Sequence, residues 1–483
     1  MLAVAHVLGL LLATFALAYA LPIGCSLLLA DGLWPKFLLA AAITAGCGLL
    51  LAGATFPFRR ELKPRDGFLL VTLGWLLLAA AAALPLLLTL PQLTFTGAFF
   101  EAMSGLTTTG STVLDGLDQL APSLNFWRHS LHWFGGLGII VMALAVLPLL
   151  GVGGMQLYKG LLASGPVKEE RLAPRIAATA KSLWLVYALI TAAGIASLRI
   201  CGMSWFDAVC HAFSAVGLGG FSTHDRSIAY FDSPAIELVL IALMLIASLN
   251  FARHIITLRR LSLESYQRDP ECKAIFAMLS VSVVGIAVLL TQDGVYAHFT
   301  TALRHSAFNV VSQATTSGLV TQDYQRWPVF APYWMLFLSC IVCSTGSTGG
   351  GIKMFRTLLL ARQAGRELTL LVHPAAIVPV RIGGRPIPDG VGHAVLAFIF
   401  LYFMTVALLT FAMLLTGLDF DPSFSAIVAS INNTAHGFGP PGAVHNFHAL
   451  SALQIWICTA AMLLGRLEIF SVIVLFRPAY WRK

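Results

Sequence analysis

Long apolar stretches alternate with short polar segments along almost the whole chain. A helix needs about 20 apolar residues to cross a bilayer, at about 1.5 Å per residue. The first two stretches predict a leading helical hairpin, and the others group in pairs around four short polar runs. The predicted spans cover approximately residues 7–29, 37–56, 68–88, 126–150, 183–200, 235–256, 274–290, 332–343 with a continuation after a break, 394–415 and 449–476.

Each of the four polar runs is centred on one small residue. The proposed centres, Gly110, Gly217, Gly318 and Ala435, recur about every hundred residues, which marks an internal repeat. A short apolar segment precedes each run and is too short to span, so we predict four re-entrant half-helices. These half-helices are expected at residues 95–106, 205–214, 300–313 and 424–431.

Irregular backbone at membrane depth leaves N–H and C=O groups without helical partners, which is unfavourable in lipid. Such backbone is tolerated only where it is buried in protein or lines water, and four segments around one axis can form a cation filter of carbonyl oxygens. Glycine adopts the required φ > 0 conformations at little cost, and a neighbouring Thr hydroxyl can face the ion or support the strand. One glycine alone would equally suit a turn or a helix contact, but four equivalent ones favour a filter. The predicted filter residues are Thr108, Thr109, Gly110, Ala215, Val216, Gly217, Thr315, Thr316, Ser317, Gly318, Asn433, Thr434 and Ala435.

The centre of the fourth run is open between Ala435 and Gly437. Three phenylalanines, Phe99, Phe206 and Phe424, lie the same distance before Gly110, Gly217 and Ala435 respectively. The third run has Ala307 at that place and does not discriminate. This spacing favours Ala435 as the filter residue of the fourth run.

Composition identifies a membrane protein. Of the 483 residues, 58% are hydrophobic and only 11% are charged, whereas a soluble domain carries about 25% charged residues. The first span lacks a basic segment before it, so we predict a retained helix rather than a cleaved signal peptide. The cysteines and histidines show no metal-ligand spacing, and no base–nucleophile pair is visible. The sequence therefore predicts no enzyme and no organic cofactor.

Lysine and arginine are concentrated in alternate loops, around residues 59–65, 159–181, 253–273 and 353–385, and in the C-terminal tail. The positive-inside rule places these loops and the C-terminus in the cytoplasm, so the half-helices enter from outside. Their C-terminal dipole ends then point to the bilayer centre, which favours a cation there. The net charge of +8 thus reflects topology and predicts no nucleic-acid partner.

Five aspartates fall on the predicted outer side. They can attract cations toward the filter, or they are ordinary solvated loop charges, and the sequence leaves both readings open. They are Asp115, Asp118, Asp225, Asp293 and Asp323.

Four motifs carry a resemblance to a known family. They are HWFGGLG at 132–138, GLGGFST at 217–223, STGSTGGGIK at 344–353 and GRLEIF at 465–470. With them the chain resembles the membrane subunit of the Trk/Ktr/HKT potassium transporter superfamily, most closely its TrkH type, over essentially its whole length. The resemblance implies a multi-pass homodimer in the bacterial cytoplasmic (inner) membrane, surrounded by membrane lipid, with one K+ pathway per subunit. It also implies a cytosolic nucleotide-binding regulatory partner of the TrkA type.

The fourth filter departs from the family pattern, which commonly reads Asn-x-Gly-Pro-Gly-x-Gly-Pro. Here Ala435 replaces the filter glycine and His436 replaces the proline. An L residue in the left-handed conformation costs about 1–2 kcal/mol. We therefore expect weaker discrimination between potassium and sodium than the family pattern implies.

A glycine-rich run interrupts the eighth apolar stretch in mid-membrane. Glycine costs about 1 kcal/mol relative to alanine in a helix interior, so consecutive glycines should unwind the helix. A phosphate-binding loop would need glycine directly before Lys353, where Ile352 stands, so no nucleotide site is predicted. The resemblance implies a mobile gating loop below the filter, and a static kink is the alternative. The predicted gate residues are Gly346, Gly349, Gly350, Gly351, Lys353 and Arg466.

Arg466 is predicted near the middle of the last span. A central arginine costs about 2.5–3.5 kcal/mol on insertion scales, so it should face water or a partner. Glu468 lies on another face of the same predicted helix and cannot pair with it there. Arg466 therefore either projects into the pathway as a barrier to cations, as the family match implies, or forms a salt bridge to another helix.

Together these features predict an all-α polytopic membrane protein. Four pseudo-symmetric helix–pore-loop–helix repeats surround one ion pathway, and a two-helix hairpin precedes them. The expected function is potassium uptake through the filter, gated by the intramembrane loop and the cytosolic subunit. A sodium-permeable or sodium-coupled transporter of the same fold and an organic-solute secondary transporter are the alternatives. The expected units are the hairpin at 1–60 and repeats at 61–158, 159–262, 263–370 and 371–483.

Overall fold

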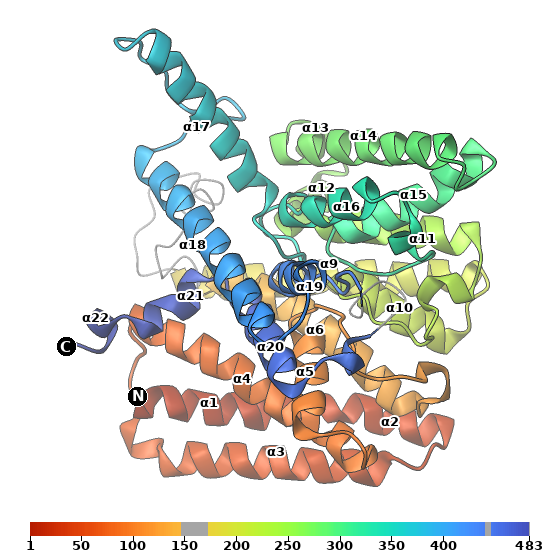
Figure 1. Cartoon of the computed structure of the whole chain (residues 1–483). Helices are drawn as coiled ribbons and strands as arrows, with labels where there is room; N and C mark the ends of the chain where they lie inside the picture. Colours follow the sequence, from red (N-terminus) through yellow and green to blue (C-terminus); the bar gives the residue numbers. More distant parts are fainter. Residues whose placement is uncertain (146–171, 440–445, 483) are drawn as a thin grey trace.

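The computed structural model describes residues 1–145, 172–439 and 446–482. This part of the chain is almost entirely helical (Figure 1), which confirms the predicted all-α fold. Within it, six helices are long and apolar enough to cross a membrane, or up to eight if each of two bent helix pairs counts as one span. The described part contains one small antiparallel sheet, in which β1 (Arg381–Ile382) pairs with β2 (Arg385–Pro386).

The chain begins with the predicted hairpin. One arm is α1 (Leu2–Phe15) continued by a short 3-10 turn and α2 (Ala20–Leu29), and the other is α3 (Trp34–Ala54). The two arms touch through their backbones at Gly9 and Gly48: a Cβ on Gly9 would lie 2.7 Å from the carbonyl oxygen of Gly48. The hairpin lies along one edge of the molecule and packs on α4 and α6.

Four repeats follow, each made of a long helix, a half-helix, an extended strand and a second helix. Thr94 and Ser204 cap the first two half-helices, accepting hydrogen bonds from Gly97 N and Asp207 N at 3.2 Å and 3.0 Å. The helices of the first two repeats are α4 (Pro64–Thr89), α5 (Phe95–Leu106), α6 (Pro122–Ala145), α9 (Leu172–Ile200), α10 (Trp205–Gly217), α11 (Pro234–Ser248) and α12 (Phe251–Arg260). Those of the last two are α13 (Glu264–Gln267), α14 (Pro270–Gln292), α15 (Phe299–Ala314), α16 (Phe330–Ile341), α17 (Met354–Val372), α18 (Asp389–Leu414), α19 (Phe420–Asn432), α20 (Ala452–Arg466), α21 (Phe470–Ile473) and α22 (Pro478–Trp481).

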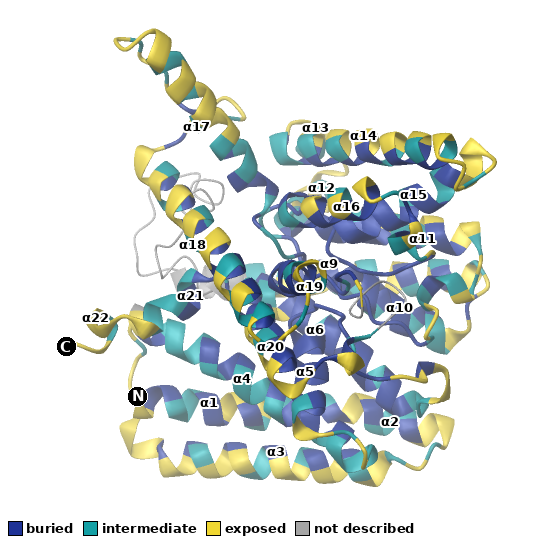
Figure 2. Ribbon diagram, in the orientation of Figure 1, coloured by how far each residue is buried: buried dark blue, intermediate teal, exposed yellow. Residues whose placement is uncertain are grey.

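The repeats close into a ring. The second helix of each repeat packs against the half-helix of the next: α6 on α10, α11 on α15, α16 on α19, and α20 back on α5. The half-helices and their strands are buried at the centre, whereas α17 and the outer faces of α3 and α18 are exposed (Figure 2). A buried polar segment therefore lies on the inside of the ring in every repeat.

Two predicted continuous spans are wrong. The span expected at 235–256 is bent by 102° between α11 and α12, and the span expected at 449–476 is bent by 105° after α20. At the first bend Asn250 caps the new helix by accepting a hydrogen bond from Ala252 N at 2.8 Å, while Phe251 N bonds the carbonyl of Gly346. At the second, Glu468 and Ile469 both adopt positive φ. These breaks arise from tertiary contacts that hydropathy does not register.

The predicted boundary between the first two repeats, at 158 and 159, and the end of the span predicted at 126–150 lie outside the described residues. The apolar core falls into two halves. One half packs the hairpin with repeats 1 and 4, and the other packs repeats 2 and 3. The four polar strands lie between these halves.

Candidate functional site

All four half-helices end in the same backbone conformation. The residue two positions before each strand centre is left-handed, although none of the four is glycine. The following amide then donates to the carbonyl five residues earlier, at 2.8–2.9 Å in every repeat. The left-handed residues are Thr108 (φ 52°), Leu218 (φ 55°), Thr316 (φ 62°) and Asn433 (φ 55°).

This alignment corrects the centre of the second strand. Gly217, with Ala215 and Val216, belongs to α10, and the residue equivalent to Gly110 is Gly220. A Cβ on Gly217 would lie 2.7 Å from the carbonyl oxygen of His132, so this glycine serves a close helix contact. The spacing from Phe206 misled because Phe206 is the second residue of α10, whereas Phe99 is the fifth residue of α5, so the two phenylalanines are not equivalent.

The four strands meet one another around the ring. A Cβ on Gly110 would lie 1.8 Å from Gly219 O, and one on Gly220 would lie 2.3 Å from Ser317 O. A Cβ on Gly318 would lie 2.5 Å from the Cβ of Ala435. The ring closes where Ser111 Oγ donates to Ala435 O at 2.8 Å. These approaches bring together every predicted filter segment except 215–217, which 218–220 replaces.

The fourth strand differs from the other three. Gly110, Gly220 and Gly318 have φ of 82°, 85° and 76°, whereas Ala435 does not adopt positive φ. Its carbonyl oxygen accepts the hydrogen bond from Ser111. The register predicted for Ala435 is therefore consistent with the structure, and the backbone there takes a different course because alanine avoids the left-handed region.

The glycine-rich run is unwound and lies against the filter strands. Gly350 N donates to Thr316 Oγ1 at 3.0 Å, and Thr348 Oγ1 donates to Val216 O at 3.1 Å. Lys353 Nζ donates to Gly349 O at 2.6 Å, which ties the end of the run to its middle. The run between α16 and α17 is thus a loop attached to the C-terminal end of α10 and to the strand of repeat 3.

Arg466 is the last residue of α20 and contacts this loop directly. Its guanidinium donates to Thr348 O at 2.8 Å and to Gly135 O at 2.9 Å. In the described part of the chain Arg466 makes no ion pair, because Glu468 pairs with Arg356 instead. The salt-bridge alternative for Arg466 has no acidic partner among the described residues, and the buried guanidinium lies between the loop and α6.

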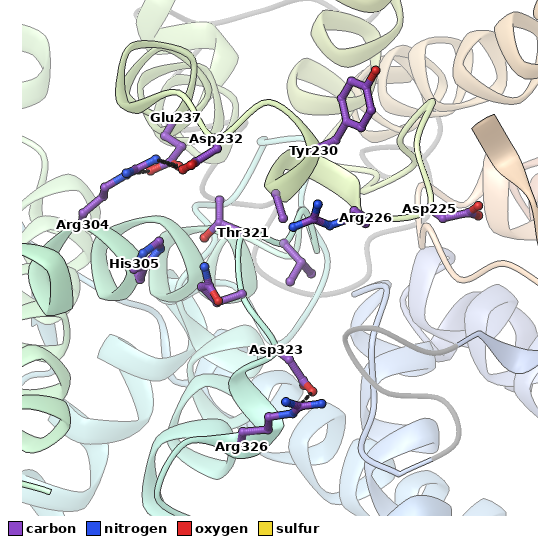
Figure 3. Close-up of a pocket in the computed structure, with 13 residues that line it drawn as sticks. Asp225, Arg226, Tyr230, Asp232, Glu237, Arg304, His305, Thr321, Asp323 and Arg326 are labelled. Atoms are coloured by element: carbon purple, nitrogen blue, oxygen red, sulfur yellow. Dashed lines mark hydrogen bonds and ion pairs between the residues drawn. The ribbon is translucent and has the colours of Figure 1, made fainter. Parts of the chain in front are cut away.

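The predicted outer side carries a polar cleft of about 670 Å³ between repeats 2 and 3 (Figure 3). Arg304 bridges Glu237 and Asp232 across it, and Arg326 pairs with Asp323. These acids are neutralised by arginines within the cleft, so the cleft itself offers little net attraction to a cation.

A second polar cluster joins repeats 1 and 2 beside this cleft. His224 Nδ1 lies 2.5 Å from Asp118 and its Nε2 lies 3.5 Å from Asp207, while its ring stacks on Tyr230. Burial lowers the pKa of His224, but the hydrogen bonds and charges of Asp207 and Asp118 outweigh it and raise the pKa above its usual value. Of the five outer aspartates, Asp118 therefore has a structural partner and is not a free loop charge.

Sequence reasoning missed five residues of the site: Leu218, Gly219, Gly220, Ser111 and Thr348. Gly220 had a signal, because the second run contains a Gly–Gly pair after its first glycine. Ser111 and Thr348 act through contacts with distant segments, at 2.8 Å to Ala435 O and 3.1 Å to Val216 O respectively. No spacing along the chain could have shown these contacts.

Comparison with known proteins identifies the family. The family described as TrkH, cation transport protein, matches residues 40–483. The chain belongs to the TrkH family. It is 44% identical to the Trk system potassium uptake protein TrkH of Halomonas elongata, over 99% of this chain and 98% of that protein. It is 42% identical to the protein of the same name from Escherichia coli, over 100% and 99% of the two chains.

The fold agrees with a solved member of the TrkH family. The crystal structure of the potassium transporter TrkH from Vibrio parahaemolyticus superimposes with a TM-score of 0.91 at 39% identity, covering 100% of this chain and 99% of that one. The family resemblance predicted from the motifs is thus confirmed over the full length.

Proposed function

We propose that this chain is the membrane subunit of a bacterial potassium-uptake system, with K+ as the transported ion. The observation that carries the proposal is the closed ring of four strands, each entering after a half-helix and touching its neighbours at a glycine or alanine. Strands of this kind can replace the hydration shell of a cation with carbonyl oxygens. Relatives at 44% and 42% identity, named as potassium uptake proteins, support potassium as the ion.

The proposed pathway runs through the strands and then past the loop and Arg466. Thr108–Gly110, Leu218–Gly220, Thr316–Gly318 and Asn433–Ala435 form the filter in this proposal, with Thr315 ending the third half-helix. The helix dipoles of the four half-helices favour a cation at their C-terminal ends. The loop and Arg466 lie on the far side of the strands and form the proposed gate.

Restoration of growth tests this proposal. Produced with its cytosolic partner, the chain should restore growth of potassium-uptake-deficient bacteria at low potassium, and purified protein in liposomes should admit potassium and rubidium more readily than sodium and lithium. The variant Gly318→Val should fail in both assays, because a Cβ there meets Ala435 Cβ at 2.5 Å. Normal membrane expression of the wild type without rescue or potassium flux would contradict the proposal.

A sodium-permeable pore of the same fold is the second candidate, and Ala435 is the observation that favours it. We expect Ala435→Gly to raise the potassium-to-sodium permeability ratio about fivefold, because glycine removes the cost of about 1 kcal/mol that keeps this position out of the left-handed region and so lets the strand match the others. Reversal potentials of both proteins measure the ratio.

Ser111→Ala is the matched variant, since it removes only the hydrogen bond to Ala435 O. A ratio that is unchanged or lower in Ala435→Gly would mean that the strand already holds its selective geometry with alanine. The third candidate, organic-solute transport by inverted repeats, has less support because all four half-helices pack in the same way around one ring.

The proposed assembly is a homodimer in the cytoplasmic membrane with a cytosolic nucleotide-binding subunit of the TrkA type. Helix α17 extends away from the body of the molecule (Figure 1) and exposes Leu368, Leu371 and Val372 at 65%, 79% and 70%. Such a row favours burial against another subunit or lipid. The basic loops on the same predicted side and the cytoplasmic C-terminus would face the regulatory subunit.

A further inference from the structure

A buried position recurs behind each filter strand. It is the residue of the half-helix nine positions before the strand centre, and it faces the segment that follows the strand. In chain order it is occupied by Glu101, His211, Asn309 and Ala426. Glu101, Asn309 and His211 each bond to a residue two or three positions beyond the centre of their own strand.

Repeat 1 has the most extensive of these supports. The carboxylate of Glu101 accepts hydrogen bonds from Thr112 Oγ1 at 3.0 Å and Val113 N at 3.1 Å. It also accepts one from Arg128 Nε at 2.8 Å, and Glu101 and Arg128 are 1% and 0% exposed. The strand after Gly110 is therefore fixed by a charged group that is itself paired.

Arg128 extends this support into repeat 2. Its guanidinium lies over the ring of Phe221, with 4.2 Å between Cζ and the ring centroid, and it donates to Asn125 Oδ1 at 3.0 Å. Asn125 Nδ2 in turn donates to Thr223 O at 3.3 Å. Phe221 and Thr223 directly follow Gly220, so one ion pair contacts the strands of two repeats.

Repeats 2 and 3 have neutral supports. His211 Nδ1 faces the carbonyl of Asp207 and must donate to it, which leaves Nε2 to accept from Ser222 Oγ at 2.9 Å. Asn309 donates to Thr321 Oγ1 at 2.9 Å and accepts from Thr321 N at 3.2 Å.

Repeat 4 lacks a polar side chain at this position. Ala426 packs against Gly437, where a Cβ would lie 2.9 Å from Ala426 N. The neighbouring Ser425 Oγ accepts a hydrogen bond from Phe438 N at 2.7 Å. In repeat 4 the half-helix thus supports the chain after Ala435 through a neutral hydroxyl, where repeat 1 uses a charged carboxylate.

We propose that these side chains position the filter strands from behind, and that the Glu101–Arg128 pair is the support that contributes most to ion selectivity. The proposal rests on the proposed function, because it concerns the same filter. Neither residue touches the ion; both act through the strands of repeats 1 and 2. Hydrogen bonds to charged groups are roughly twice as strong as neutral ones, so the strand of repeat 1 should resist displacement more than that of repeat 4.

The test is Glu101→Gln, which keeps the shape of the side chain and removes its charge. The amide keeps one acceptor oxygen and places N–H donors where the other oxygen accepted, so either Val113 N or Arg128 Nε loses its acceptor and the strand should loosen. We expect the potassium-to-sodium permeability ratio to fall about tenfold, the change that corresponds to about 1.4 kcal/mol, with maximal potassium flux within about threefold of wild type. Reversal potentials, flux against potassium concentration and thermal unfolding are measured on the same preparations.

The matched control is Glu237→Gln. Glu237 is also a buried carboxylate and pairs with Arg304, which is partly exposed, at 2.7 Å, but in the described structure it contacts no filter strand. This variant should lose thermal stability and keep its permeability ratio. Thr112→Val serves where Glu101→Gln fails to fold, since it keeps both residues of the ion pair and removes the hydroxyl that donates to Glu101 and accepts from Arg128 and Leu114 N. Its ratio should fall about threefold, the scale of one ordinary hydrogen bond.

The outcomes separate the two proposals. A wild-type protein that conducts no potassium, or does not prefer it, contradicts the proposed function. A selective wild type whose ratio is unchanged in Glu101→Gln, or in Thr112→Val where the former does not fold, overturns only the supporting role. A fall in ratio in Glu237→Gln as large as in Glu101→Gln overturns it as well, because loss of stability alone would then explain both.

Discussion

Alanine in place of Arg466 is expected to raise cation flux about tenfold. Two unit charges about 6 Å apart at an effective dielectric constant of about 20 repel each other by about 3 kcal/mol, and mobile water and ions reduce this. If about half of that repulsion is removed from the free-energy barrier to cation passage, the rate of passage rises about tenfold. The buried guanidinium contacts only carbonyl oxygens, at Thr348 and Gly135, so no carboxylate neutralises it in the described structure. Flux of rubidium into liposomes, without the partner, measures the effect.

Glutamine at position 466 separates the effect of the positive charge from the effect of the hydrogen bond to the loop. Arg466→Gln loses the charge but can still donate to Thr348 O, whereas Arg466→Ala loses both. Equal flux from the two variants would identify the charge as the barrier, and a rise in the alanine variant alone would identify the attachment to the loop. A folded alanine variant with wild-type flux would show that Arg466 does not limit conduction.

Deletion of Gly349, Gly350 and Gly351 is expected to raise flux without the partner about tenfold, which corresponds to about 1.4 kcal/mol off the barrier. The loop is closely packed: a Cβ on Gly350 would lie 1.9 Å from the carbonyl oxygen of Asn432 at the end of α19, and one on Gly349 would lie 2.2 Å from Cys343 Sγ at the start of the loop. A shortened loop cannot keep these contacts. Conduction should then depend little on the regulatory subunit.

Deletion of glycines from a turn far from the strands controls for a general loss of folding. Gly383 and Gly384 form the exposed turn between β1 and β2, and their removal should leave flux without the partner unchanged. Thermal unfolding of both deletions reports whether the membrane part remains intact. A loop deletion that folds, conducts at the wild-type rate and responds normally to the partner would show that the run is a static break.

The half-helices could be predicted from the sequence because their signals are local. The segment expected at 95–106 coincides with α5, and the others differ by a few residues at their ends. Each is a short apolar stretch bounded by polar or small residues, and each is too short to span. The order of helix, half-helix and strand in each repeat followed from this pattern.

The second filter centre was wrong because the prediction relied on distance from an aromatic residue. Phe206 lies in the first turn of α10, whereas Phe99 lies deeper in α5. The left-handed residue that ends each half-helix is the better landmark, but two threonines, a leucine and an asparagine have no side-chain property common to all four. They are Thr108, Thr316, Leu218 and Asn433. Only the backbone hydrogen bonds make them equivalent.

The supports behind the strands were hidden for the same reason. Glu101, His211 and Asn309 differ in charge and shape while they hold equivalent positions. The bend after α11 also could not be predicted from the sequence. The two residues between the helices, Leu249 and Asn250, are neither glycine nor proline, and the surrounding stretch is apolar. Tertiary contacts with the loop at Gly346 fix that bend.

The contact between Gly9 and Gly48 bears on how the protein is made. Both contacting helices lie within residues 2–54. A Cβ on either glycine would lie only 2.5–2.7 Å from backbone atoms of the facing helix, so the two backbones are in direct contact. Helices in lipid associate through such close packing of small residues, without help from the hydrophobic effect. The hairpin can therefore assemble during synthesis, as soon as its second helix has entered the bilayer and before any filter segment exists. It then offers a preformed surface on which α4 and α6 pack, so a part of the chain that is made before the pore segments supports their assembly.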